Sequence, residues 1–163
     1  AVVGASVLML IYIWFRFKDI RFGCSSVIAL IHDVLVVLAF YAIARVYVGS
    51  PFIACMLTIV GYSINATIVI FDRIRENKSF MTGKDKLEDV INSSITQTRS
   101  RSVFTSLTTF IMVAALYILG VTSIKEFALP LMVGILCGTY SSICLASACY
   151  MVLRKVIKVK QQS

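Results

Sequence analysis

The chain has 163 residues, of which 59% are hydrophobic and only 15% are charged, and its mean hydropathy is +0.90. This composition excludes an ordinary soluble domain, in which about a quarter of the residues are charged. The net charge of +8 does not indicate nucleic acid binding, because all but Arg45 and Lys125 of the 16 Lys and Arg residues follow apolar runs in three groups. That distribution is typical of the cytoplasmic loops of membrane proteins.

Five apolar runs predict an all-α, polytopic bundle of five transmembrane helices, since most runs are long enough to cross hydrocarbon. Their ranges are about 1–15, 24–48, 51–71, 103–122 and 127–153. The basic groups follow the first, third and last runs, so these ends and the C-terminus are expected in the cytoplasm. The first residue would then lie outside, and we expect an upstream span or an extracytoplasmic domain before it. No signal peptide is evident.

The second run carries the one acidic side chain clearly within hydrocarbon, Asp33, next to His32. A carboxylate there costs about 3 kcal/mol or more unless it is paired or hydrated, and histidine titrates near neutral pH. The two residues are therefore a candidate site for taking up a proton or another ion. The alternative is a hydrogen-bond clamp between helices. No nucleophile and base accompany them, so an enzyme is not indicated.

The third run is apolar but carries polar side chains, and it ends in a burst of charge. Asn65 and Thr67 either line a transport path or bond neighbouring helices together. Gly61, beside this polar face, would allow close helix approach. The charged residues that would shape the cytoplasmic exit are Asp72, Arg73, Arg75 and Glu76.

Residues 72–102 form the only long polar connection, which we expect to be cytoplasmic. Thr82-Gly83 is expected to break the helix that continues from the third run. From Asp85 to Thr98, apolar residues recur at helical spacing. This predicts a cytoplasmic amphipathic helix on the membrane surface, either a simple linker or a moving coupling element.

The fourth run begins with a cation below a stripe of hydroxyl groups. Arg101, Thr105 and Thr108 share one helical face. This pattern is typical of a hydrated path, although an arginine that snorkels to the membrane interface is the slightly favoured alternative.

The fifth run carries small residues at four-residue spacing, which favours close contact with another helix. They include Gly134, Gly138 and Ser142. The five cysteines, Cys24, Cys55, Cys137, Cys144 and Cys149, lie within or beside apolar runs and contain no CxxC pair. Their spacing argues against a disulfide framework and a zinc site, so they are interpreted as small buried hydrophobes, and no metal or cofactor is predicted.

Several segments together resemble the SecF family. Residues 61–65 and 71–77, GYSIN and FDRIREN, closely resemble the SecF signature. Further agreement lies in residues 15–17, 29–33, 96–98 with Arg101, 105–109 and 134–143. The resemblance spans essentially the whole chain in the right order.

The resemblance implies a fold and a set of partners. SecF is a six-span protein with an extracytoplasmic domain after its first span, so this chain would supply spans two to six of one half of an RND-like pump. It would work with SecD, separate or fused, and with the SecYEG channel on preprotein substrates. The proton or sodium gradient would drive export across the bacterial inner membrane. Neither an enzyme reaction nor nucleic acid is implied.

One position departs from the family pattern. The residue after Gly-Tyr-Ser-x-Asn is normally Asp, the proposed proton carrier, but here it is Ala66. The matching arginine is retained as Arg101. Either the chain is an inactivated variant, natural or engineered, or the ion is carried by Asp33 and His32 or by SecD, or the protein assists export without ion coupling. The functional alternatives are a structural assembly subunit and an RND-type exporter of small molecules.

Overall fold

The computed structural model describes residues 4, 7, 8, 11, 12, 15, 20–46, 48–81 and 87–156. The first predicted span, residues 1–15, lies mostly outside these described residues. Within them, four helical segments are long and apolar enough to cross a membrane. The prediction of an all-helical membrane bundle is therefore confirmed, with four of the five expected spans in the described part.

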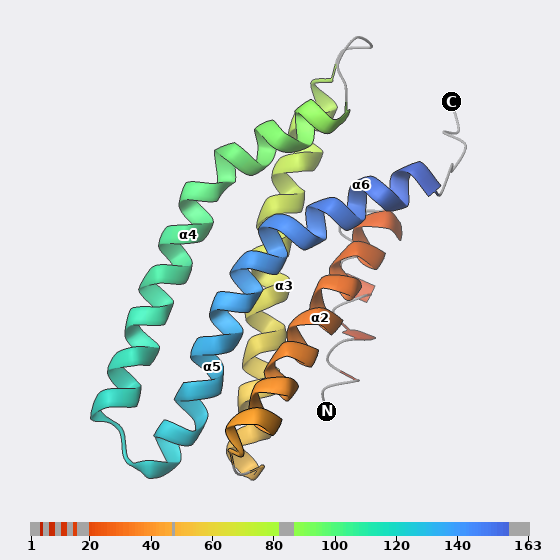
Figure 1. Ribbon diagram of the computed structural model, residues 1–163. Coiled ribbons are helices and arrows are strands. Elements are labelled where there is room, and N and C mark those ends of the chain that lie inside the picture. The colour runs from red at the N-terminus through yellow and green to blue at the C-terminus, as the bar shows by residue number, and fades with distance from the viewer. Residues whose placement is uncertain are drawn as a thin grey trace.

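The helices run side by side in alternating directions (Figure 1). Their bounds are α2 Ile20–Ala44, α3 Ser50–Ser79, α4 Leu87–Leu119, α5 Thr122–Tyr140, η1 Ser141–Leu145 and α6 Ala146–Val156. Helix α3 lies within the bundle and contacts α2, α4 and α5. Helix α6 continues from α5 through η1 and leans over the start of α2, shown in blue and orange in Figure 1.

The helices at the end of the bundle where α3 ends and α4 begins are longer than the sequence predicted. The third run was expected to leave the membrane at residue 71, but α3 continues to Ser79. Residues 72–79 contain neither glycine nor proline, so nothing in them interrupts the helix. Helix α3 thus takes up residues 72–79 of the predicted connection, and the expected break at Thr82-Gly83 lies outside the described residues.

The amphipathic helix is present but is not a separate element on the membrane surface. Its described part, from Leu87, continues without a break into the fourth span as α4. Ile91 and Ser94 are fully buried, and Asn77 of α3 donates a hydrogen bond to Ser94 (2.8 Å). The apolar stripe of α4 thus packs against the extension of α3. The surface of α3 buries this stripe in place of the expected membrane surface.

The fifth span is interrupted by one π-helical turn. The amide N–H of Ala146 donates to the carbonyl of Ser141, five residues earlier, where an α-helix would use a residue four earlier. Pro130 lies inside α5. Such π-turns are rare in proteins, and those that occur often lie at functional sites. This one separates α5 from the leaning α6.

Two apolar clusters hold the bundle together. In the first, the ring of Phe22 stacks on Tyr150 with centroids 4.2 Å apart and meets Phe71 edge-on at 4.9 Å. These rings fix α6 against α2 and α3. The second cluster lies towards the other end and includes Val37 and Ile59. Along α2, Asp33 falls between the two clusters, so a polar group lies where apolar packing would otherwise continue.

Candidate functional site

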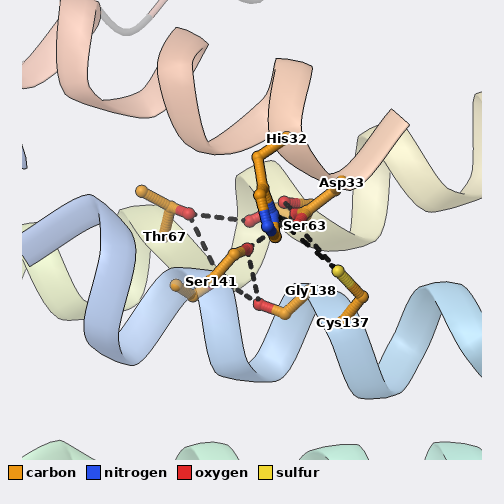
Figure 2. Close-up of polar contacts among 8 residues, drawn as sticks. His32, Asp33, Ser63, Thr67, Cys137, Gly138 and Ser141 are labelled. Carbon is orange, nitrogen blue, oxygen red and sulfur yellow. Dashed lines mark hydrogen bonds and ion pairs between the residues drawn. The ribbon is translucent and has the colours of Figure 1, made fainter. Parts of the chain in front are cut away.

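A buried carboxylate lies at the contact of three helices. We call His32, Asp33, Ser63, Cys137 and Ser141 the Asp33 cluster (Figure 2). The side chain of Asp33 is 0% exposed. Its Oδ2 atom accepts hydrogen bonds from the Ser63 hydroxyl and from the Ser141 hydroxyl at 2.7 Å.

The other carboxylate oxygen faces a different pair of groups. The thiol of Cys137 donates to Oδ1 over 3.4 Å, and Nδ1 of His32 lies 3.2 Å from the same atom. Both oxygens therefore have partners, which removes much of the cost of burying this carboxyl among apolar helices.

Asp33 lies against the backbone of the facing helix. A Cβ added to Gly138 would lie 3.7 Å from Asp33 Oδ2, which is an ordinary van der Waals contact, so α5 and the carboxylate are close neighbours here. Ser141, one turn later, is the first residue of the π-turn η1. The interruption of the fifth span is thus adjacent to the group that holds the acid.

Two further hydroxyl groups, those of Thr67 and Ser142, lie beside this cluster and reach it through backbone carbonyls. Thr67 donates to the carbonyl of Ser63 (3.0 Å) or to the hydroxyl of Ser142 (3.2 Å). Ser142 in turn donates to the carbonyl of Gly138 (2.6 Å). All of these side chains are buried. They connect the surroundings of Asp33 with a second polar region on another face of α3.

That second region is a cleft between α3, α4 and the fifth span, which we call the Arg101 cleft. It contains about 500 Å³ of empty space, including its open side. Its lining residues are Tyr62, Asn65, Ala66, Val69, Arg101, Ser102, Thr105, Ser106, Thr139 and Ser142. At its wall, the hydroxyls of Tyr62 and Thr139 both bond to Ser106, at 2.6 and 2.7 Å.

The cleft has a cation but no acid. Among the described residues, the guanidinium of Arg101 makes no hydrogen bond or ion pair, and no lining residue is a carboxylate. The methyl group of Ala66, the position at which the resemblance implies a carboxyl, lines the cleft. Asp33 and Arg101 therefore lie in separate regions, and both regions are bordered by α3 and the fifth span.

The structure divides the predicted transport residues between the two regions. Asn65, Ala66, Arg101 and Thr105 line the cleft, whereas His32, Asp33 and Thr67 belong to the buried side. Thr108 does neither: its hydroxyl donates to the carbonyl of Thr105 at 2.9 Å. An ion-carrying role for the residues of the cleft and of the Asp33 cluster stays a prediction.

Sequence reasoning missed the groups that hold Asp33 from the fifth span. Cys137 was interpreted as a small hydrophobe and Ser141 was not singled out. The only available signal was the Ser141-Ser142 pair within an apolar run. Ser106 and Thr139, which bond to each other across the cleft wall, were also missed as a pair because they are 33 residues apart.

The residues of the predicted exit join α3 to α4. Arg73 forms an ion pair with Glu76 (2.6 Å) and donates to the side chain of Gln97 at 2.7 Å. Asn77 donates to the same Gln97 oxygen at 3.0 Å. Asp72 and Arg75 also have interaction partners. These polar groups hold the two helices together at this end of the bundle.

The predicted small-residue contacts are present in the fifth span but not at Gly61. A Cβ added to Gly134 would lie 2.5 Å from Cδ1 of Ile59, so the glycine lets α5 approach α3 closely. Ser142 is buried and bonded as described above. No described atom outside its own helical turn lies within 4 Å of a Cβ built on Gly61, so that glycine borders open space.

Comparison with known proteins places this arrangement in a family. The family model described as "Protein export membrane protein SecD/SecF, C-terminal" matches residues 1–156. The protein translocase subunit SecF of Sebaldella termitidis is 50% identical over 162 residues, which cover 99% of this chain and 52% of the relative. The subunit SecDF of Thermus thermophilus is 44% identical over 163 residues, covering 100% of this chain and 22% of the relative.

The fold agrees with solved structures of the same family. The crystal structure of SecDF in its "Super-membrane-facing form" matches with a TM-score of 0.86 and 44% identity, covering 93% of this chain and 20% of that chain. The chain spans about half the length of the SecF relatives that it matches. It belongs to the SecD/SecF family of protein export membrane proteins and corresponds to the C-terminal part of SecF.

Proposed function

We propose that this chain is the membrane-embedded part of a SecF-type subunit that works with SecD to promote preprotein export at the SecYEG channel. The observation that carries this proposal is the family match over residues 1–156. The fused SecDF relative supports SecD as the partner. The basic groups at the end of the bundle where α3 ends support a cytoplasmic C-terminus in the bacterial inner membrane.

Asp33 is our proposed ion-carrying group of this subunit. Ala66 cannot bind a proton, and Asp33 is the buried acid of the transmembrane part. When Asp33 is ionised, both oxygens accept hydrogen bonds; when it is protonated, one of them becomes a donor. If Oδ2 takes the proton, the Ser63 or Ser141 hydroxyl must turn to accept it, and Ser141 lies at the π-turn between α5 and α6. Protonation would in this way bias the geometry of the fifth span.

The hydroxyls of Thr67 and Ser142 bond to each other beside the Asp33 cluster, and Ser142 lines the Arg101 cleft, so we place them on the proposed path of the proton. Arg101 would keep anionic or dipolar groups, including water, in the open part of the cleft. In this role Asn65 and Thr105 are polar lining, and Asp33 replaces the missing carboxyl of position 66 as the group that titrates.

A structural assembly subunit is the second candidate, and the acid-free cleft is the observation that favours it. Such a subunit would hold SecD beside the channel without carrying ions. An exporter of small molecules has no comparable support, since the relatives are named as translocase subunits.

The experiment that separates these functions uses the intact protein that carries this chain, produced in cells lacking their own SecF. Preprotein export is measured in membrane vesicles with and without a proton or sodium gradient, and SecD is tested for copurification. The proposal expects gradient-stimulated export, which Ala66→Asp preserves or raises and Arg101→Ala lowers. If export is the same with and without a gradient while SecD copurifies, the assembly subunit is correct. Failure of both copurification and export overturns the export proposal itself.

A further inference from the structure

We propose that His32, Asp33 and Cys137 form a binding site for a thiophilic divalent cation, with Zn²⁺ as the biological example. This inference does not rest on the proposed role in export, and a bound ion would occupy the carboxylate that is proposed to carry protons. It rests on one nitrogen, one oxygen and one sulfur donor that the fold brings together from two helices, with all three atoms within 4.8 Å of one another.

The separations of the donor atoms suit a tetrahedral ion. Oδ1 of Asp33 lies 3.2 Å from Nδ1 of His32 and 3.4 Å from Sγ of Cys137. The distance from Sγ to Nδ1 is 3.9 Å. Tetrahedral Zn²⁺, with bonds of about 2.0–2.3 Å, sets its donors about 3.3–3.6 Å apart. Small side-chain movements would therefore be enough to admit the ion.

The surroundings of the three donors resemble those of metal ligands. Ser63 and Ser141 hold Oδ2 of Asp33 and leave Oδ1 facing the histidine and the cysteine, as Figure 2 shows. Hydrogen bonds that orient ligating carboxylates in this way are typical of metal sites. His32 is 39% exposed and Cys137 is half-buried, so one side stays open for the ion and a fourth ligand.

Charge and donor chemistry select the kind of ion. A divalent cation bound by one carboxylate, one thiolate and one neutral imidazole makes a complex with no net charge, which lowers the cost of placing it among apolar helices. The Cys137 thiol releases its proton to solvent when the ion binds. Sulfur and imidazole donors favour Zn²⁺ and Cd²⁺ over Mg²⁺ and Ca²⁺.

The test compares the intact protein, purified in detergent, with Cys137→Ser and with Cys144→Ser. Cys144 is exposed and lies outside the cluster, so Cys144→Ser is the matched control. We expect wild type and Cys144→Ser to bind one more equivalent of Zn²⁺ than Cys137→Ser. Cd²⁺ should give a thiolate charge-transfer absorption that Cys137→Ser lacks. Equal stoichiometry and equal absorption in wild type and Cys137→Ser would overturn the proposal.

A second variant tests the surrounding hydrogen bonds and guards against misfolding. Ser141→Ala keeps all three donors but removes one of the two hydrogen bonds that hold Oδ2 of Asp33, so the Kd for Zn²⁺ should rise about 10–100-fold. Zn²⁺ should raise the Tm of wild type and leave that of Cys137→Ser unchanged, while both have similar Tm values in chelator. If Zn²⁺ raises the two Tm values equally, or raises neither, the site does not exist.

Discussion

The Asp33 cluster and the Arg101 cleft lie on different faces of α3, and their charged groups have opposite surroundings. In the cluster, the carboxyl of Asp33 is 0% exposed. Hydroxyl groups contact one of its oxygens, and a thiol and an imidazole contact the other. In the cleft, an exposed guanidinium faces hydroxyl and amide groups, and within the described residues it has no anionic partner. The carboxyl of Asp33 is buried and bonded, whereas the guanidinium of Arg101 is exposed.

The difference teaches that charge in a membrane bundle can be stabilised in two ways. Asp33 is a part of the packing, so removing it should disturb the contact of three helices. Arg101 is a part of a surface, so removing it should alter what the cleft attracts but hardly affect folding. Thr67 and Ser142, the hydroxyls between them, are where the two regions could exchange a proton.

The largest expected effect separates the two charges by stability. Asp33→Leu removes the acceptor of the buried Ser63 hydroxyl and the shorter of the two hydrogen bonds of Ser141, and it should lower the free energy of unfolding by about 2–5 kcal/mol. Arg101→Leu should change it by less than about 0.5 kcal/mol, as exposed substitutions usually do. Denaturant unfolding in detergent measures both values. Similar losses for the two variants would mean that the cleft is as much a part of the packing as the cluster.

The next effect concerns the contact of α3 and α5 beside the cluster. Gly134→Ala places a methyl group within 2.6 Å of two Ile59 carbons. Ile59 is fully buried, so the overpacking should cost about 1–3 kcal/mol. Gly138→Ala meets only ordinary contacts of 3.6–3.7 Å and serves as the control, which should be unchanged or stabilised by up to about 1 kcal/mol because alanine favours a helix more than glycine does. Thermal unfolding of the two variants compares them, and the reverse order would contradict the described helix contact.

A smaller effect on stability tests the hydroxyl connection. Thr67→Val keeps the shape of the side chain but removes one buried hydrogen bond, which should cost about 1 kcal/mol. Gradient-stimulated export should nevertheless fall towards the level seen without a gradient, and Thr67→Ser should restore it. Thr108→Val, at a hydroxyl outside both regions, is the matched control. Unchanged stimulation in Thr67→Val would show that protons do not pass between the two regions here.

The smallest expected change in stability concerns an ion pair that lies outside both regions. Glu76→Gln removes the ion pair between Arg73 and Glu76, whose side chains are 36% and 55% exposed, respectively. Exposed pairs of this kind contribute about 0–1 kcal/mol. The variant should therefore unfold within about 1 kcal/mol of wild type, and less difference should remain in high salt. A loss comparable to that of Asp33→Leu would show that the end of the bundle is more tightly coupled than its exposure indicates.

The sequence predicted the membrane class and the unusual acid from simple physical signals. Apolar length identified the spans because each must cross hydrocarbon by itself, and Asp33 was conspicuous because carboxylates are costly there. The pairing of Ala66 with Arg101 in one cleft followed from the family resemblance, since no spacing rule relates residues on separate helices.

Other features required the three-dimensional arrangement. Cys137 and Ser141 are 104 and 108 residues from Asp33, so their joint contact with it leaves no local signal. The periodicity near Ile91 predicted a helix correctly but could not tell whether a membrane or α3 would bury its apolar stripe. The π-turn at Ser141 was likewise not predicted from the apolar run that contains it.

The most direct test of the central claim is the gradient dependence of preprotein export by Asp33→Asn. Asparagine keeps the size and most of the hydrogen bonds of the side chain but cannot titrate. With Asp33 as the ion-carrying group, the variant should assemble with SecD, export preprotein at the level seen without a gradient and gain nothing when the gradient is applied. Full gradient stimulation in an assembled Asp33→Asn variant would contradict the account and assign Asp33 a structural role alone.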